Sequence, residues 1–344
     1  MPDFDPNTIG NTNNNIFGLP YTPDTAMVVF IPIPWEVTVS YNPGTADAPE
    51  AVFNASFQVD LSDPFKENAW TTGYAMTGIS DEIKSRNEKL KPLSFDIIQS
   101  LSEGKNIASD PQLQKKLSVV NQGCTELNSW VEKETKKYID RNKLIGIIGG
   151  DHSVPLGFLQ TLASKHKNFG IMQIDAHADL REAYEGFTFS HASIMHNALK
   201  IPQISKLVQL GIRDYCREEY CTIEQSAGRI RTFFDREVKH QLFEGKTWKS
   251  ICDEIIQNLP EMVYISFDVD GLDPKLCKST GTPVPGGYDL PEIFYLLESI
   301  VNSGKKIIGF DLCEACPGDF GWDANVASRI LYKLANIMSK SNNI

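Results

Sequence analysis

The chain has 344 residues, with 33 Lys+Arg against 44 Asp+Glu, a formal net charge of −11 and 41% hydrophobic residues. At about 150 residues per domain, this length predicts two domains or one large α/β domain with a sizeable core. The acidic balance argues against nucleic acid and against an anionic membrane surface as partners, because both attract a basic patch. The longest apolar run, Met27 to Pro34, is too short to span a bilayer.

Targeting and redox signals favour the cytoplasm. The first residues, MPDFDPNTIG, have neither the basic nor the apolar region of a signal peptide. The seven cysteines are scattered without a paired framework, which is typical of a reducing compartment. Cys313 and Cys316 form a Cys-x-x-Cys that could be a redox or zinc pair, but the sequence has no second such motif. Because the motif begins at the end of an apolar run, we favour a structural role for it.

The first half of the chain changes character along its length. Residues 1–26 are polar and Asn-rich, which predicts an N-terminal arm or a disordered lead-in. The β-branched run at 27–34 predicts a first strand. Residues 80–140 are charged and contain few Gly or Pro, which predicts helices. Within them, 130–142 has the pattern of an amphipathic helix with solvated charges.

From residue 143 onward, short apolar runs alternate with helix-like segments. The runs are continuous, as expected for strands that are buried on both faces. The alternation predicts a parallel sheet covered by helices on both sides, in one α/β domain over residues 27–344. The predicted strands lie within 143–150, 168–175, 206–212, 261–268 and 305–312, and the predicted helices within 153–164, 190–199, 246–258, 290–303 and 323–339.

Acidic residues and histidines gather where the predicted strands end, and open α/β sheets place their sites at such carboxyl ends. His152 follows the first of these strands in the sequence Gly-Gly-Asp-His. An Asp-x-His-x-Asp begins at Asp175, and an Asp-x-Asp begins at Asp268. Residues spaced by two in an extended segment point to one side, so we expect each motif to present its side chains together. The converging groups are His152, Asp175, His177, Asp179, Asp268 and Asp270.

Four carboxylates in one crevice repel one another unless cations compensate their charge. Two divalent ions would do so, with two of the carboxylates bridging them. The set combines oxygen and imidazole without thiolate, which suits Mn²⁺ or a similar first-row ion better than structural zinc. The alternative is a polar rim of capped helices and turns. That alternative fits Asp151, expected to bond backbone in the Gly-Gly turn, and Asp273, expected to begin a turn or cap.

The three motifs together resemble those of the ureohydrolase family, which includes arginase, agmatinase and formiminoglutamase. The resemblance extends over roughly residues 27–335, and its early part carries Ala48 where the family usually has Gly. It implies a three-layer α-β-α sandwich around a mostly parallel, roughly eight-stranded sheet, and a homotrimer or homohexamer. The motifs are GGDHSVPLG (149–157), DAHADL (175–180) and SFDVDGLDP (266–274), with PGTADAPEAVFNAS (43–56) as the early part.

The resemblance also implies roles for single residues. Six side chains would hold two divalent metal ions per chain, with Mn²⁺ expected first and Ni²⁺ second, and Asp179 would also pass on a proton. His191, in FSHAS, matches the family's proton shuttle, although Ala192 replaces the usual Gly and the residue could be an ordinary loop histidine. Glu314, in GFDLCEACPG, matches the Glu that holds the guanidinium, and Pro317 of the family's context is retained. By the resemblance, His152 and Asp179 bind one ion, His177 and Asp270 bind the other, and Asp175 and Asp268 bridge them.

The implied reaction is hydrolysis of a guanidinium group to urea and an amine or ammonia, with metal-activated water as the nucleophile. Arginases recognise the α-amino acid end of arginine with polar residues after Asp-x-His-x-Asp, and residues 180–190 lack that pattern. Arg181 could contact a carboxylate or form a salt bridge, while Glu182 or Glu185 could attract an amine or stay solvated. We therefore expect a small guanidino substrate without an α-carboxylate, either free guanidine or agmatine. Arginase or formiminoglutamase activity is the alternative.

Residues 34–41, PWEVTVSY, resemble an agmatinase-like subgroup that includes hydrolases of free guanidine. Trp35 and Tyr41 could stack on a planar cation, but ordinary core positions are the favoured interpretation. Three further histidines match nothing in the family and are expected in solvated or packed positions. They are His166, His196 and His240.

Two other functional classes compete with the ureohydrolase interpretation. A deacetylase-like hydrolase with one zinc ion keeps an Asp-x-His and an Asp, but His152 and the full triplet at 175–179 argue against it. A metal-stabilised regulatory or scaffolding subunit would need neither His191 nor Glu314, because neither residue holds metal. Their presence favours an enzyme.

Overall fold

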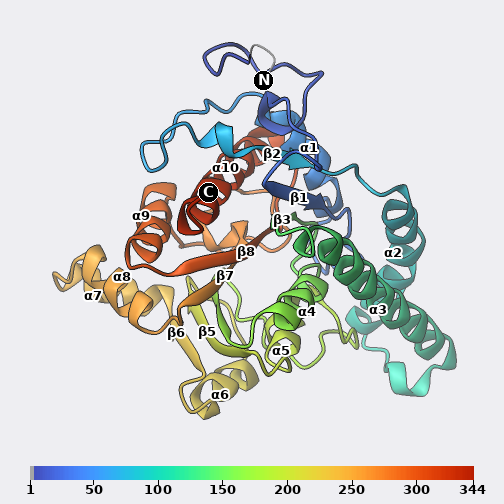
Figure 1. Cartoon of the computed structure of the whole chain (residues 1–344). Helices are drawn as coiled ribbons and strands as arrows, with labels where there is room; N and C mark the ends of the chain where they lie inside the picture. Colours follow the sequence, from blue (N-terminus) through green and yellow to red (C-terminus); the bar gives the residue numbers. More distant parts are fainter. Residues whose placement is uncertain (1–3) are drawn as a thin grey trace.

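One sheet of eight parallel strands runs through residues 4–344, the part of the chain that the computed structural model describes (Figure 1). The strand order is β2-β1-β3-β8-β7-β4-β5-β6, and every neighbouring pair is parallel. The expected mostly parallel, roughly eight-stranded sheet is confirmed. The strands are β1 (Val28–Pro32), β2 (Tyr74–Met76), β3 (Leu144–Ile148), β4 (Phe169–Ile174), β5 (Ile204–Leu210), β6 (Ile230–Phe233), β7 (Met262–Asp268) and β8 (Lys306–Cys313).

The apolar runs of the sequence correspond to six of these strands, β1, β3, β4, β5, β7 and β8. The two strands that the sequence does not reveal, β2 and β6, form the edges of the sheet. They contain three and four residues, too few to make a recognisable apolar run. In β1 and β4 every residue is buried, which explains why these runs are continuous instead of alternating.

Helices cover both faces of the sheet and give the expected three layers (Figure 1). The helices predicted in the second half of the chain are found as α4, α8, α9 and α10, whereas 190–199 divides into the 3-10 turn η5 (His191–Ser193) and a short α5. No helix among the described residues combines the length and apolar content that crossing a membrane requires. The α-helices are α1 (Ala48–Ser56), α2 (Asp81–Ser102), α3 (Pro111–Ile139), α4 (Leu156–Lys165), α5 (Ile194–Ala198), α6 (Arg217–Gln225), α7 (Asp235–Phe243), α8 (Trp248–Gln257), α9 (Leu290–Asn302) and α10 (Trp322–Ser341).

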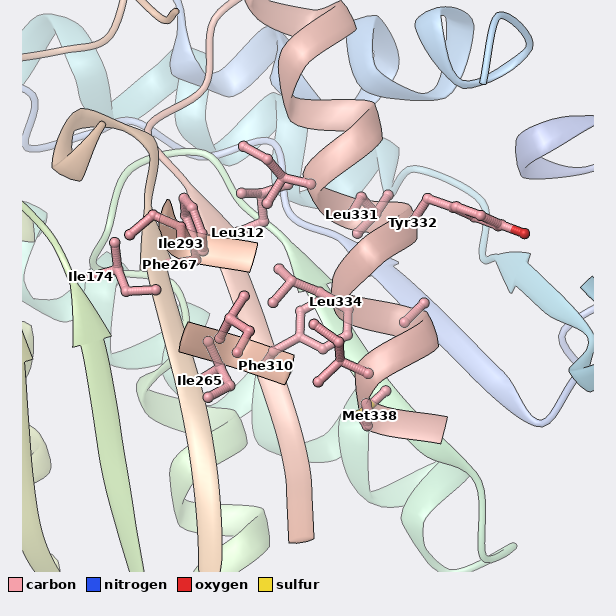
Figure 2. Close-up of a cluster of buried hydrophobic side chains, with 14 of the residues drawn as sticks. Ile174, Ile265, Phe267, Ile293, Phe310, Leu312, Leu331, Tyr332, Leu334 and Met338 are labelled. Atoms are coloured by element: carbon pink, nitrogen blue, oxygen red, sulfur yellow. The ribbon is translucent and has the colours of Figure 1, made fainter. Parts of the chain in front are cut away.

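Two hydrophobic cores lie on opposite faces of the sheet, because alternate residues of each strand point to opposite sides. On one face, Phe310 and Leu312 of β8 pack with Leu331 and Leu334 of α10 (Figure 2). On the other face, α3 and α4 contribute the second core, with Phe158 fully buried in it. Removing this apolar surface from water is the main stabilising term of the fold.

Part of the Asn-rich segment 1–26 packs against the domain, which differs from a disordered lead-in. Phe17 and Leu19 are at most 2% exposed. Asn15 pairs with the free edge of β2, where its Nδ2 donates to the Met76 carbonyl at 3.1 Å and its Oδ1 accepts the Met76 N–H at 2.8 Å. The side chain takes the place of a neighbouring strand and so protects the sheet edge from pairing with another chain.

A buried polar network joins the segment before β2 to α9 and α10. Asp63 accepts hydrogen bonds from Lys333 Nζ at 2.9 and 3.1 Å and from Asn336 Nδ2 at 2.8 Å. Lys333 also pairs with Glu298 at 2.6 Å. Burial acts to raise the pKa of Asp63, but the hydrogen bonds from Asn336 and Lys333 outweigh it and hold that pKa below its ordinary value. The ionised carboxylate is therefore the form that the fold stabilises.

Replacing Asp63 with Ala should lower the free energy of unfolding by about 3 kcal/mol at neutral pH, because the buried Lys333 loses a main partner. Denaturant unfolding measures the effect, with Asp60→Ala at an exposed position as the control. The difference should shrink as the pH falls below about 4, because the lowered pKa of Asp63 stabilises the fold only while the carboxylate is charged. Equal stability of the two variants at neutral pH would contradict the role given to this network.

Candidate functional site

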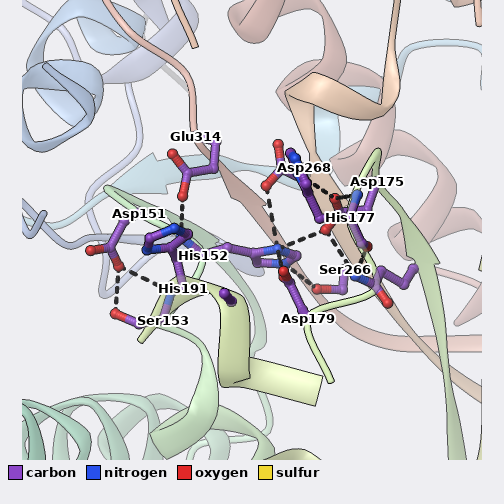
Figure 3. Close-up of polar contacts among 12 residues, drawn as sticks. Asp151, His152, Ser153, Asp175, His177, Asp179, His191, Ser266, Asp268 and Glu314 are labelled. Atoms are coloured by element: carbon purple, nitrogen blue, oxygen red, sulfur yellow. Dashed lines mark hydrogen bonds and ion pairs between the residues drawn. The ribbon is translucent and has the colours of Figure 1, made fainter. Parts of the chain in front are cut away.

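Four adjacent strands of the sheet, in the order β3, β8, β7 and β4, carry the candidate site at their carboxyl ends. His152 follows β3, Glu314 follows β8, Asp268 ends β7 and Asp175 follows β4. The strand order thus brings together residues that are distant in sequence (Figure 3). Open α/β sheets place their sites at these carboxyl ends of the strands.

The imidazole of His152 lies among three carboxylates. Its Nδ1 is 3.0 Å from Asp175 Oδ2, 3.0 Å from Asp179 Oδ2 and 3.3 Å from Asp268 Oδ2 (Figure 3). All four side chains are buried. Burial alone would lower the pKa of His152, but the carboxylates of Asp175 and Asp179 outweigh it and hold that pKa well above its ordinary value. The cluster therefore attracts positive charge to this point.

A second imidazole, His177, faces the other side of Asp175. Its Nδ1 is 2.9 Å from Asp270 Oδ2 and 3.7 Å from Asp175 Oδ1. Two groups of potential metal ligands result, one formed by His152, Asp175 and Asp179 and the other by Asp175, His177 and Asp270. The donor atoms within each group lie within 4.8 Å of one another, and Asp175 belongs to both groups.

The backbone at these motifs differs from the extended segments that the sequence suggested. Asp268 Oδ1 accepts the Asp270 N–H at 2.8 Å and begins the 3-10 turn η6 (Val269–Gly271). Asp175 Oδ1 accepts the His177 N–H at 2.6 Å. Asp179 adopts a left-handed φ of 55°. The motifs are therefore not extended throughout, and the N–H groups that Asp175 and Asp268 accept from two residues further on turn the chain locally.

Two polar side chains that the sequence motifs did not single out support His152 from the other side of its ring. The His152 Nε2 is 2.8 Å from Ser266 Oγ, and Ser266 donates to Asp311 Oδ2 at 2.9 Å. Ser266 and Asp311 lie inside the buried strands β7 and β8. A polar residue within a continuous apolar run is the signal that could have found both. Their contacts orient the imidazole so that Nδ1 faces the carboxylates.

A second line of hydrogen bonds across β4, β5 and β6 holds Asp175. Gln173 Nε2 donates to Asp175 Oδ2 at 2.8 Å, Gln209 Nε2 donates to Gln173 Oε1 at 2.7 Å, and Thr232 Oγ1 donates to Gln209 Oε1 at 2.7 Å. All of these side chains are buried. The chain of partners fixes the carboxylate that the two donor groups share.

Repulsion within the cluster shows that it accommodates added positive charge. Burial, followed by the charges of Asp270 and Asp175, raises the pKa of Asp268 well above its ordinary value. Burial and the charge of Asp175 raise the pKa of Asp179 to about 7. Two buried atoms of the cluster, His152 Nδ1 and Asp270 Oδ2, make no contact with hydrogen-bond geometry among the described residues and lie only against the ionisable groups named above. Buried oxygen and imidazole donors of this kind fit divalent cations.

The two other predicted site residues, His191 and Glu314, have different surroundings. The ring of His191 meets Tyr184 edge-on, with 6.1 Å between ring centroids. Burial, together with the imidazoles of His177 and His152, lowers the pKa of His191 to about 4. Glu314 is buried, adopts a left-handed φ of 61°, and accepts the His152 N–H on its Oε1 at 2.8 Å. Left-handed backbone at Glu314 is the kind of strain that functional sites retain.

A cavity of about 290 Å³ adjoins the cluster. His177, Asp179 and His191 contribute to its wall, whereas Glu314 does not. The rest of the wall includes Ser40, Tyr41, Arg181, Tyr184, Asp214, Tyr215, Glu219, Thr282, Pro283 and Val284. A pocket of this size, with charged groups at one end and aromatic rings around it, fits a small polar ligand.

The aromatic residues Trp35 and Tyr41 differ in their exposure to solvent. Trp35 is fully buried in the core, as the favoured interpretation held. Tyr41 is 77% exposed and lines the cavity, so a core position was the wrong prediction for this residue. Trp35 lies three residues after β1, and its backbone packs against Gly150, whereas Tyr41 lies further along the same loop.

Among the charged residues of the 180–190 loop, Arg181 lies in the cavity wall and the two glutamates do not. Arg181 lines the cavity, with its guanidinium 4.8 Å from the ring centroid of Tyr184 and its Nε 3.8 Å from Glu219 Oε2. Of the two roles considered for Arg181, a salt bridge is the more common one, and Arg181 faces Glu219 in this way. Glu182 is exposed, and neither Glu182 nor Glu185 lies in the cavity wall.

Asp151 and Asp273 form local turns, as expected from sequence. Asp151 Oδ1 accepts the Ser153 N–H at 3.0 Å. Asp273 Oδ1 accepts the Lys275 N–H at 3.0 Å. Neither residue belongs to the two donor groups. The turn interpretation of both residues is confirmed.

Cys313 and Cys316 are buried free thiols, and neither belongs to a potential metal-binding group among the described residues. A Cβ on Gly149 would come within 2.5 Å of Cys313 Sγ, so this thiol packs tightly against the Gly-Gly turn. The histidines without a family match lie outside the cluster. His166 and His196 are partly buried, and His240 is exposed.

Known proteins resemble this chain in sequence and in fold. A model of the Arginase family matches residues 26–335. The N(1)-aminopropylagmatine ureohydrolase of Thermus thermophilus is 28% identical over 93% of both chains, and the agmatinase of Bacillus cereus is 24% identical over 86% of this chain and 85% of that one. The solved proclavaminate amidino hydrolase of Streptomyces clavuligerus has a TM-score of 0.74 and 21% identity, over 97% of this chain and 99% of that one.

The family match covers the stretch over which the sequence motifs suggested a resemblance. The predicted reaction class, a hydrolase acting on linear amidine C–N bonds, is confirmed at the level of the family. The solved structure confirms the three-layer fold. The chain belongs to the arginase family.

Proposed function

We propose that the protein is a binuclear metal-dependent ureohydrolase that cleaves the guanidinium group of a small substrate and releases urea. The observation that carries the proposal is the pair of donor groups that share Asp175 beside a cavity walled by His177, Asp179 and His191. The ureohydrolase and agmatinase names of relatives support the reaction.

The donor set suits two divalent cations per chain, Mn²⁺ in the first place and Ni²⁺ in the second. When bound, the ions would offset the buried negative charge and lower the pKa of a water between them, which makes hydroxide available at neutral pH. In this proposal His152 and Asp179 would hold one ion, His177 and Asp270 would hold the other, and Asp175 and Asp268 would be shared by both.

The other roles fall to side chains of the protein. Asp179, on the cavity wall, accepts a proton from the attacking water, and His191 relays that proton to the leaving nitrogen. Glu314 uses Oε1 to accept the His152 N–H, which leaves Oε2 to pair with the planar guanidinium. A Cβ at Gly281 would come within 2.8 Å of that Oε2, so the absence of a side chain at Gly281 prevents a clash with this oxygen.

The substrate is proposed to lack an α-carboxylate, with free guanidine or agmatine as the best candidates. Arg181 is the cation of the cavity wall, and it already faces Glu219 and the ring of Tyr184. The exposed Asp214 and the ring of Tyr41 leave the rest of the wall better suited to a cation than to a carboxylate. Arginine or formiminoglutamate is the alternative.

The proposal extends to the organisation of the protein. Residues 27–344 form the catalytic domain, preceded by the arm at 1–26. The protein acts in the cytoplasm as a homotrimer or homohexamer. The free state of all seven cysteines supports a reducing compartment, and the family resemblance supports the assembly.

Urea release by purified protein, reconstituted separately with Mn²⁺ and with Ni²⁺, tests this function. The panel consists of free guanidine, agmatine, guanidinobutyrate, arginine and formiminoglutamate, with formamide assayed for the last. We expect turnover of guanidine or agmatine and little turnover of arginine. Preference for arginine would contradict the proposed substrate. No product from any substrate of the panel, with two ions bound per chain, would contradict the proposed reaction.

Replacing Asp268 with Ala should abolish urea release and weaken metal binding together, because Asp268 is a proposed bridge between the ions. Thermal unfolding with and without added Mn²⁺ reports metal binding without any need for activity. The matched control is Asp273→Ala, which removes a carboxylate from the adjacent turn that is not a proposed metal ligand. A Mn²⁺-induced stabilisation that survives unchanged in Asp268→Ala would exclude the bridging role.

Replacing His191 with Ala should lower kcat by about a hundredfold and leave the bound metal unchanged, because the residue handles a proton and holds no ion. His196→Ala, five residues further on, serves as the control. Steady-state kinetics together with metal analysis measure both quantities. Full activity of His191→Ala would show that the proton-transfer assignment is wrong, and loss of metal would make the residue a ligand instead.

A further inference from the structure

Three polar side chains of α2 hold the segment that follows β1. Asn87 Oδ1 accepts the Glu36 N–H at 2.8 Å, Lys91 Nζ forms an ion pair with Glu36 Oε1, and Ser94 Oγ donates to the Val37 carbonyl. The spacings of four and three residues place them on one face of the helix. Asn87 and Ser94 are at most 6% exposed, although α2 is otherwise a charged surface helix. We call Asn87, Lys91 and Ser94 the α2 clamp.

The carboxylate held by the clamp closes a loop. Glu36 is 5% exposed, and its Oε2 accepts the N–H groups of Gly44 and Ala46 and faces the Thr45 hydroxyl. The two ends of the 36–46 segment are therefore tied together through one side chain. The amides belong to the N-cap and the first turn of the 3-10 turn η2 (Thr45–Asp47), which leads into α1, and a negative charge is favourable at this point. Lys91 compensates the charge of this buried group.

The segment held in this way lies directly against the candidate site. The Trp35 carbonyl accepts the Asp151 N–H at 2.8 Å, immediately before His152. A Cβ on Gly150 would come within 1.8 Å of the Trp35 oxygen, so the two backbones touch. The backbone of Thr38 lies within hydrogen-bonding reach of the His191 ring. The loop thus contacts both the turn that bears His152 and the ring of His191.

The same loop forms part of the cavity wall and joins it to a second loop. Ser40 and Tyr41 line the cavity. The Asn42 N–H donates to the Gly281 carbonyl at 3.2 Å, and Asn42 Nδ2 donates to the Ser279 carbonyl at 3.0 Å. Displacement of the 36–46 segment would therefore be passed on to the loop next to Glu314.

We propose that Lys91 is a positioning residue of the active site, which acts through Glu36 to hold the 36–46 loop against the His152 turn and His191. Lys91 is not among the cavity-lining residues and does not contact the donor groups, so its effect on catalysis is indirect. Small displacements of positioned groups lower the rate strongly, because the reacting geometry is lost while binding of the ligands persists. The catalytic part of this inference rests on the proposed function, whereas the contact between α2 and the loop does not.

The test compares Lys91→Met, Lys91→Arg and the control Lys89→Met. Methionine keeps most of the side-chain length and removes the charge, and Lys89 is an exposed lysine of the same helix. Hydrogen exchange of the 36–46 amides measures the hold on the loop without any need for activity. Steady-state kinetics and metal analysis measure its effect on the site.

We expect Lys91→Met to speed exchange of the Gly44 and Ala46 amides and to lower kcat by about tenfold, with unchanged metal content. Lys91→Arg should keep most of the slow exchange and most of kcat, and Lys89→Met should behave like the parent protein. A variant destabilised far from the loop, Asp63→Ala, should keep its kcat at a temperature where it is folded, which separates positioning from general loss of stability.

Three results would overturn the inference. Unchanged exchange in Lys91→Met would show that the ion pair does not hold the loop. Faster exchange with unchanged kcat would show that the loop is held but does not position the site. Loss of bound metal in Lys91→Met would place the effect in metal binding instead. If the parent protein releases no urea from the panel, the proposed function fails while the exchange result still decides whether Lys91 holds the loop.

Discussion

Four carboxylates are buried beside two imidazoles at the carboxyl ends of the central strands, and the rest of the structure depends on this constraint. The four carboxylates, Asp175, Asp179, Asp268 and Asp270, are at most 4% exposed and share the space around the His152 and His177 rings. Such a cluster is unfavourable by itself, because burial removes water from charges that repel one another. In the proposed function two cations resolve this conflict, and the same cations supply the chemistry.

The surrounding structure is organised to maintain this cluster. Buried polar side chains, which cost stability in an apolar strand, are kept where they orient a donor, with Ser266 and Asp311 behind His152 and Gln173 behind Asp175. The central strands bring the donors together, and the connecting turns aim them. The α2 clamp supports the site from further away, because this peripheral helix holds the loop that contacts the site. Stability elsewhere, as in the hydrophobic cores on both faces of the sheet, offsets these local costs.

The sequence predicted the features that repeat a strong pattern and missed those that depend on contacts between distant segments. Continuous apolar runs located six strands, and the three motifs contain the five residues that form the two donor groups. The edge strands β2 and β6 were missed because strands of three and four residues have no pattern of their own. The sequence placed Phe17 in an N-terminal arm or disordered lead-in, because its polar neighbours gave no sign of a buried residue. Tyr41 and Trp35 could not be separated by sequence, because only the path of the loop decides which ring reaches the cavity.

The central claim, that the cluster holds two cations, is tested most directly by the number of ions bound per chain. Protein stripped of metal, reloaded with Mn²⁺ and freed of excess ion can be analysed by elemental mass spectrometry against protein concentration. We expect two ions per chain, with weaker binding of both when the shared Asp175 is replaced by Ala. A single ion per chain at saturation, or binding that is indifferent to Asp175, would contradict the claim.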